Sequence, residues 1–203
     1  TMANRNTVGF GLIAQGTVGS SDANQGQGKY FIDANSAVAM FQGSVVQSKA
    51  GYIADAEAAR TRLTIGILNG IFFNAATTQK PTFQNHYVAN TVPANAEDIT
   101  AFVIDNPLQL FSVSVDGAIT AASYGLTVST TQAIPSGSTS SGQSNKQLNV
   151  AANTNASNNQ FRLLRSAEDV ENEDILVANS TQIVCQNLNQ YMQNTGTAGI
   201  TWQ

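Results

Sequence analysis

Apolar residues recur along this chain in short runs separated by Gly, Asn, Pro and Asp, a pattern typical of β-strands joined by turns. The strict alternation of Val113 and Val115 with Ser112 and Ser114 predicts a strand with one buried face and one solvated face. We expect further strands at Tyr30–Ile32, Ala37–Phe41, Ser44–Val46, Ile99–Ile104, Tyr124–Ser129, Phe161–Leu164 and Gln182–Leu188. Helical texture is scarce: Ala54–Arg62 and Ser166–Glu173 are the two short candidates.

Two Gly-containing pairs predict β-hairpins. Asn69-Gly70 interrupts the apolar segment Leu63–Asn74, and both of its residues tolerate the positive φ that a tight hairpin turn requires. Asp116-Gly117 stands between the alternating strand and Ala118-Ile119-Thr120. We therefore expect each pair to reverse the chain direction.

These elements together predict an all-β sandwich or barrel (jelly-roll-like) with very little helix. Residues 1–28 are rich in Gly, Asn, Gln and Ser, and they are expected to form either an extended N-terminal arm or the first strand. Residues 29–203 would form one β-rich domain. Within it, Pro135 to Asn145 is expected to be a Ser/Gly-rich surface loop or linker.

The composition changes the expected function more than the expected fold. Charged residues are 11% of the chain, against about 25% in an average globular domain, and Asn plus Gln outnumber them. The net charge is −4 and Lys and Arg are scattered, so the sequence shows no basic patch of the kind that binds nucleic acid. Such a surface is more typical of shell, fibre and secreted β proteins than of metabolic enzymes.

Candidate chemistry is sparse. His86 is the single histidine and lies in a polar stretch, while the single cysteine, Cys185, lies in an apolar run and is expected to be a buried thiol. Residues 9–14 match a relaxed dinucleotide-binding pattern, but no strand is expected before them and no helix after them, as that site requires. The acidic cluster at 168–174 lacks the regular spacing of a calcium-binding loop. We therefore expect no enzymatic activity, cofactor or metal. No long apolar run or secretory signal is visible, so we expect neither a membrane-spanning nor a secreted protein.

Several short motifs along the chain carry a resemblance, and the first is Ile67-Leu68-Asn69-Gly70-Ile71-Phe72-Phe73. Asp105-Asn106-Pro107 leads into Leu110-Phe111-Ser112-Val113, Phe161-Arg162-Leu163-Leu164 precedes an acidic turn, and residues 183–191 form a late strand with a polar end. From Leu63 to Tyr191 this order resembles capsid decoration (cement) proteins of tailed bacteriophages of the marine podophage and cyanophage type. The resemblance implies a non-enzymatic virion protein, commonly a homotrimer. It would be assembled in the host cytoplasm, bind the major capsid protein on the outer capsid surface and stabilise the shell by bridging capsomers.

The candidate partner-binding residues are Phe10, Leu12, Ile13 and Trp202. The first three lie in a segment whose glycines are expected to make it flexible. Trp202 lies near the C-terminus and is a candidate anchor because aromatic side chains concentrate at the centres of interfaces. Ordinary packing in the chain's own core is the competing interpretation for all four. The alternative function is a tail- or fibre-associated glycan-binding module that stacks sugars on Tyr30, Tyr52, Tyr87 and Tyr124. A polysaccharide-degrading enzyme ranks last, because no acid/base pair stands out.

Overall fold

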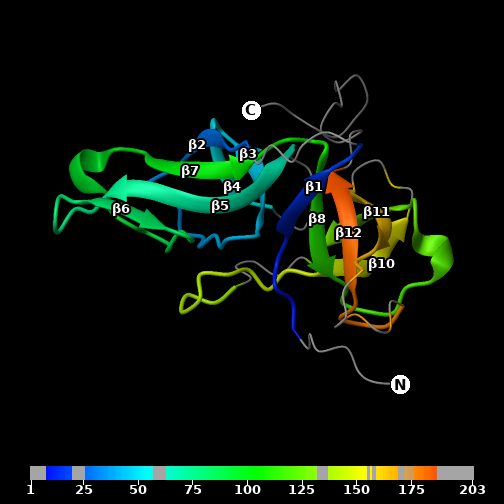
Figure 1. Ribbon diagram of the computed structural model, residues 1–203. Helices are drawn as coiled ribbons and strands as arrows, with labels where there is room; N and C mark the ends of the chain where they lie inside the picture. The colour runs from blue at the N-terminus through cyan, green and yellow to red at the C-terminus, as the bar shows by residue number, and fades with distance from the viewer. Residues whose placement is uncertain are drawn as a thin grey trace.

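A computed structural model of the chain describes residues 8–19, 26–56, 63–131, 137–154, 159–168 and 176–186, together with residues 156, 172 and 174. The described chain is almost entirely β, with two 3₁₀ turns at Ala94–Ala96 and Ala121–Ser123. Its strands form two antiparallel sheets that do not close into a barrel (Figure 1). The expectation of an all-β, sandwich-like fold is therefore confirmed.

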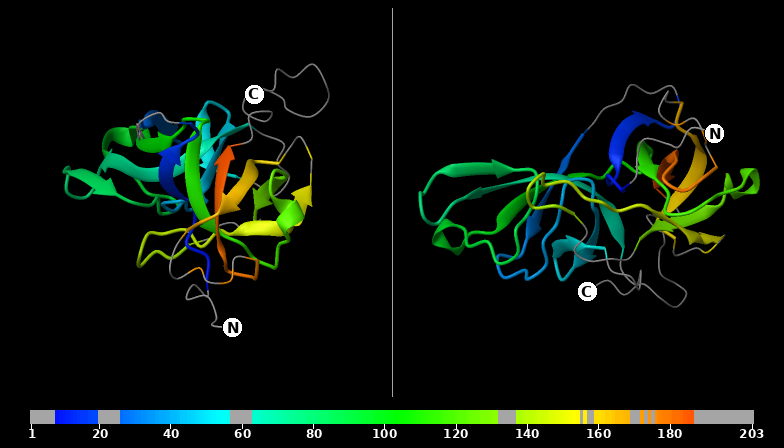
Figure 2. Two further views of the ribbon diagram at one scale, coloured as in Figure 1. Left: turned by 45° about the vertical axis from the view of Figure 1, so that its right-hand side comes forward. Right: turned by 90° about the horizontal axis from the view of Figure 1, so that it is seen from below.

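Each sheet contains six strands. In sheet A the order is β1 (Ile13–Thr17), β8 (Gln109–Ser114), β12 (Thr181–Gln186), β11 (Phe161–Ser166), β9 (Thr127–Thr130) and β10 (Leu148–Thr154). In sheet B the order is β2 (Gly28–Ile32), β7 (Ile99–Ile104), β5 (Thr64–Asn74), β3 (Val45–Lys49) and β4 (Tyr52–Asp55), and β6 (Pro81–Gln84) also pairs with β5. Figures 1 and 2 show that the far ends of β5, β6 and β7 project beyond sheet A.

The first hydrophobic core lies between the two sheets. Phe111 and Val113 of β8 are buried in it together with Val45, Ile67 and Ile104 of sheet B. The alternation of apolar and serine residues therefore predicted correctly which face of β8 is the core face. The serine face was predicted to be solvated, and that was wrong. Ser112 and Ser114 are both buried, and Gln15 and Gln147 donate side-chain hydrogen bonds to their hydroxyl groups at 3.0 and 3.2 Å.

The second hydrophobic core belongs to sheet B alone. Its edge strands β2 and β4 approach each other, so the sheet curls around side chains such as Ile71 and Ile99. Met40 and Tyr87 form an isolated bridge that is also buried in this core. The predicted strand at Ala37–Phe41 is therefore reduced to a single bridged residue, because residue 40 pairs with a loop rather than with a neighbouring strand.

Residues 64–74 form one uninterrupted strand, so the hairpin predicted at Asn69-Gly70 was wrong. Neither residue adopts a positive φ. The pair instead marks a β-bulge, where the register of β5 against β7 shifts between Leu68 and Gly70. A Cβ atom on residue 70 would lie 3.1 Å from the carbonyl oxygen of Gln84, so glycine serves close approach of the backbones here and not chain reversal.

The hairpin predicted at Asp116-Gly117 was also wrong. The chain bends there, but β8 pairs with β1 and β12 and not with the residues that follow. The N–H of Ile119 instead donates to the carbonyl oxygen of Leu176 at 2.8 Å. The turn signal was present, but the segment after it has its hydrogen-bond partner elsewhere.

The helical candidates begin in strands. Ala54 lies within β4 and Ser166 ends β11, while residues 57–62, 169–171 and 173 lie outside the described residues. The remaining predicted strands are present with shifted ends, and β9 starts at Thr127 because Tyr124 lies in a turn.

The N-terminal segment and the Ser/Gly-rich segment both contact the body of the chain. Ile13–Thr17 forms β1, which pairs antiparallel with β8 of the same chain. Residues 137–145 contribute isolated bridges, including one between Gln143 and Gln42, and Asn85 donates to the carbonyl oxygen of Ser141 at 2.8 Å.

Two different strands pair with the same edge of the long strand β5. Its first part pairs with β3 through residues 64–67, and its last part pairs with β6 through residues 71–74. The other edge of β5 pairs with β7 through residues 67–72. Two short strands thus share one side of a long one.

Candidate interaction surface

Four phenylalanine side chains form an aromatic patch on the outer face of sheet B, the face opposite its own core. The patch comprises Phe31, Phe72, Phe83 and Phe102, which lie on four different strands. Phe72 and Phe83 are directly opposite in the β5–β6 pairing, with ring centroids 4.7 Å apart, and the Phe83 and Phe102 centroids are 6.5 Å apart. Phe83 is 72% exposed and Phe31 is 49% exposed. Large aromatic surface is therefore left in contact with water.

The patch is exposed because the two sheets overlap only in part. Side chains two residues apart in a strand lie on the same face, so Phe102 shares a face with Ile104. Ile104 is buried in the core between the sheets, whereas Phe102 is only half-buried. The patch thus begins where sheet A no longer covers sheet B.

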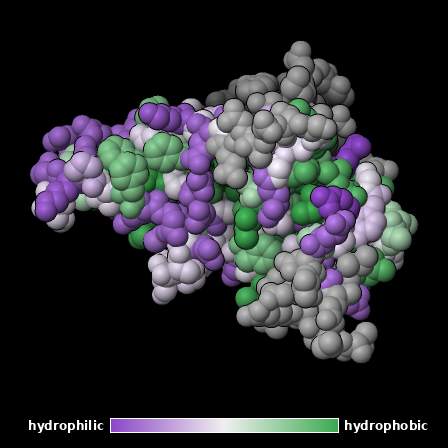
Figure 3. Space-filling view, viewed as in Figure 1, coloured by the Kyte–Doolittle hydropathy of each residue, from purple (hydrophilic) through white to green (hydrophobic). Residues whose placement is uncertain are grey.

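The strand neighbours of the patch include polar and charged residues. Lys29 is opposite Phe102 and Thr100 is opposite both Phe31 and Phe72 in the strand pairings. Figure 3 shows a hydrophobic area over the outer parts of β5 and β7 with hydrophilic surface around it. An apolar area with a polar rim is the usual anatomy of a protein interface.

A second candidate surface is a groove of about 660 Å³ on sheet A, lined by both polar and apolar side chains. Two of the residues predicted to bind a partner, Phe10 and Ile13, line this groove together with Leu110 and Ile183. Ile13 is 49% exposed, whereas Leu12 is buried in the core between the sheets and its N–H donates to the carbonyl oxygen of Gly43 at 3.0 Å. Trp202 lies outside the described residues.

Three of the four tyrosines of the glycan-binding alternative pack in or against a hydrophobic core. Tyr87 is fully buried and donates from its hydroxyl group to the carbonyl oxygen of Ser36 at 2.8 Å. The prediction that Tyr87 stacks on a sugar was therefore wrong. Tyr30 is half-buried, packs against the core of sheet B and donates to Asp105 at 2.8 Å. Tyr124 instead packs against the core between the sheets.

Sequence reasoning missed the aromatic patch because its members are far apart along the chain. Phe72 and Phe73 are adjacent and equally apolar, so the sequence does not say which of them faces outward. A usable signal was present at Lys29-Tyr30-Phe31-Ile32, where alternation with the fully buried Ile32 indicates that Phe31 faces away from the core.

The residues considered for catalysis or metal binding do not converge. His86 stacks on Phe41 with centroids 5.9 Å apart, and its Nδ1 lies 2.9 Å from the Asn85 side-chain oxygen. Among the described residues, no group of three or more His, Cys, Asp or Glu side chains is arranged to hold a metal ion. The dinucleotide-like segment 9–14 leads into the strand β1 and not into a helix. Of the acidic cluster, residues 169–171 and 173 lie outside the described residues, and Glu168 is exposed next to Arg165 at 3.8 Å.

Cys185 should react slowly in the folded protein. It is half-buried in β12, and burial raises the pKa of its thiol, although the Arg162 guanidinium opposes the shift. Because a raised pKa leaves less thiolate at a given pH, labelling by a thiol reagent at pH 8 should be slower in native than in denatured protein. The native rate should increase at higher pH. Equal native and denatured rates would contradict the burial of this thiol.

No protein-family model, curated protein sequence or solved structure matches this chain. Within the described residues, none of the helices has both the length and the apolar character needed to cross a bilayer.

Proposed function

We propose that this chain is a non-enzymatic structural protein of a virion, which binds the outer surface of a phage capsid and stabilises it by bridging capsomers. The observation that carries the proposal is the aromatic patch on sheet B, an exposed apolar surface with no partner in the described chain. The sequence resemblance supplies the class of partner, the major capsid protein. A homotrimer is proposed on the same basis.

Bridging requires two separate contact surfaces on one molecule. The aromatic patch on sheet B and the groove on sheet A provide two, on different sheets. One would bind one capsomer and the other would bind its neighbour or another copy of the chain. Many copies on one lattice would then resist separation of the capsomers even if each single contact is weak.

The low charge of the chain fits this role. Removing an ionised side chain from water costs far more than removing an apolar or amide side chain, unless the charge is paired. Charged residues are 11% of the sequence, so large areas of this surface can be buried against a shell at a small desolvation cost.

Electron cryomicroscopy of virions of the encoding phage tests the proposal. We expect density for this fold on the outer capsid lattice and a trimer by light scattering of the purified protein. Density confined to the tail, or particles without the chain, would refute a role on the shell.

Phe83→Ser should weaken capsid binding roughly 10- to 100-fold per contact, because burying a phenylalanine side chain contributes about 1.5–3 kcal/mol. The measurement is co-sedimentation with capsids that lack the protein, over a range of protein concentrations. The matched control is Val92→Ser, since Val92 is 70% exposed but lies outside the aromatic patch. Equal loss in both variants, or no loss in Phe83→Ser, would rule out the patch as the capsid contact.

A glycan-binding module of a tail or fibre remains the second candidate, and the observation that favours it is the same row of aromatic rings. Rings on a sheet surface can stack on the apolar faces of sugars. Binding of the isolated protein to a glycan array, lost in Phe83→Ser, would favour this candidate. Absence of binding to every glycan on the array would count against it.

A further inference from the structure

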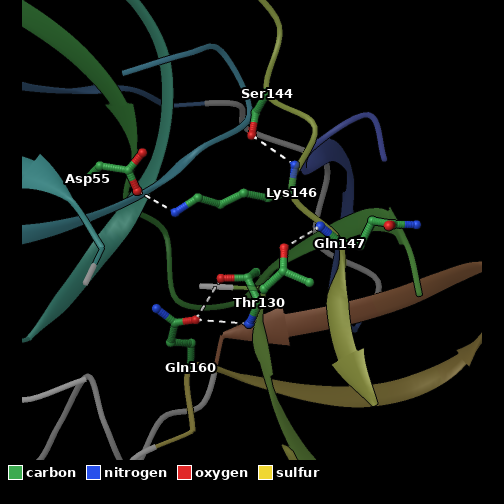
Figure 4. A network of polar contacts seen from close by, with 7 residues as sticks. Asp55, Thr130, Ser144, Lys146, Gln147 and Gln160 are labelled. Atoms are coloured by element: carbon green, nitrogen blue, oxygen red, sulfur yellow. Dashed lines mark hydrogen bonds and ion pairs between the residues drawn. The ribbon is translucent and has the colours of Figure 1, made fainter. Parts of the chain in front are cut away.

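A buried pair of oppositely charged side chains joins sheet B to the segment that leads into sheet A. Lys146 lies in the segment before β10 and Asp55 lies at the end of β4, and both side chains are 0% exposed. Figure 4 shows the lysine side chain extending toward the carboxyl group, and the Lys146 Nζ contacts Asp55 Oδ1. The other carboxyl oxygen, Oδ2, has no hydrogen-bond partner in the described chain.

The surroundings make a charged pair unfavourable. Residues next to both members belong to the core between the sheets: Ala56 follows Asp55, and Leu148 lies two residues after Lys146. A buried ion pair offsets its desolvation cost only when further hydrogen bonds satisfy the remaining polar atoms, and here Oδ2 is left unsatisfied. Burial raises the pKa of the Asp55 carboxyl group, while the Lys146 ammonium group opposes the shift.

Both backbones are held in place at the contact. The Lys146 N–H donates to Ser144 Oγ at 3.2 Å and its carbonyl oxygen accepts from Gly11 at 3.2 Å. On the other side, Asp55 pairs with Val46 in the sheet, and the next N–H, of Ala56, donates to the carbonyl oxygen of Val45 at 2.9 Å. Reacting groups held in contact and shielded from water have a large effective concentration.

We propose that Lys146 and Asp55 condense to an intramolecular isopeptide bond, formed by the chain itself. A proton passes from the ammonium group to the carboxylate, which gives a neutral amine and a neutral carboxylic acid. The amine nitrogen attacks Cγ, the C–N bond forms, and the C–O bond to the hydroxyl group breaks. The hydroxyl group leaves with one amine proton as water, so no oxidant, reductant or other reactant is needed.

The product suits its surroundings better than the ion pair does. A neutral amide replaces two buried charges, and the burial of both side chains would protect the bond from hydrolysis. The bond would join residues 91 positions apart in the sequence and tie sheet B covalently to the segment that enters sheet A. This inference does not depend on the proposed capsid role.

Mass spectrometry of the full chain under denaturing conditions tests the proposal. We expect an intact mass lower than the sequence mass by one water molecule. After tryptic digestion we expect no cleavage at Lys146 and a branched peptide that joins it to the Asp55 peptide. Lys146→Arg should restore the full mass, whereas Lys80→Arg, at an exposed lysine, should keep the deficit.

The wild-type peptide map decides the question even if Lys146→Arg does not fold. An unmodified mass with normal cleavage at Lys146 would overturn the proposal. So would a water loss that maps to a cyclised aspartate without a branched peptide.

Discussion

Lys146→Ala is expected to lower the free energy of unfolding by at least about 3–5 kcal/mol, because it leaves the carboxyl group of Asp55 buried without its one observed side-chain partner. The loss of the proposed crosslink adds about 4–5 kcal/mol to this value. Denaturant titration at neutral pH, followed by fluorescence or circular dichroism, measures the change. Lys80→Ala is the control, since Lys80 is exposed and its removal should change stability by no more than about 0.5 kcal/mol. A loss below about 1 kcal/mol for Lys146→Ala would mean that water reaches Asp55 in the folded protein.

The double variant Asp55→Leu with Lys146→Met separates two contributions to this loss. Replacing both members of a buried pair by apolar residues often restores the stability that a single replacement removes. If the wild-type residues are joined covalently, the double variant also loses a crosslink that constrains the unfolded chain. That constraint is worth about 4–5 kcal/mol for a loop of this length. We therefore expect the double variant to stay below the wild type by about that amount.

Phe111→Ala is expected to cost about 3–5 kcal/mol, because it opens a cavity at the centre of the core between the sheets. Phe111 is 1% exposed and meets Phe161 edge to face, with ring centroids 6.4 Å apart and an interplanar angle of 75°. For a domain of this size the melting temperature should fall by roughly 6–20 °C, as measured by calorimetry.

The control for this prediction is Phe83→Ala, which removes the same atoms from an exposed position. We expect it to change the melting temperature by no more than a few degrees, since little core contact is lost. Equal destabilisation in the two variants would mean that the aromatic patch is packed and not available to a partner.

Local alternation in the sequence was enough to identify most strands and the core face of β8. It was not enough to identify the turns, because glycine has more than one use. At Gly70 the missing side chain allows another backbone to approach, and at Gly117 the chain bends without pairing back on itself. A scan of neighbouring residues cannot separate these uses, since the deciding contact comes from elsewhere in the chain.

The candidate surface was harder to predict than the fold. Exposure of Phe102 and burial of Ile104 on the same face of one strand depend on how far sheet A extends over sheet B. The pair of Lys146 and Asp55 was missed for a similar reason: two charged residues 91 positions apart give no local signal. Both features arise from the packing of sheet on sheet, which one strand's pattern does not encode.

The shared edge of β5 limits the ways in which sheet B could be extended by strands of other molecules. Open strand edges invite extension by other molecules, which is a route to aggregates. In sheet B, β5 is paired on both sides over much of its length, because β3 and β6 occupy one side in turn and β7 pairs with residues 67–72 on the other. The strands β2 and β4 turn toward each other, and β6 is four residues long and begins with Pro81, which has no N–H to donate. A sheet that presents a broad apolar face is thus given edges that discourage growth, so many copies can be kept at high concentration without joining strand to strand.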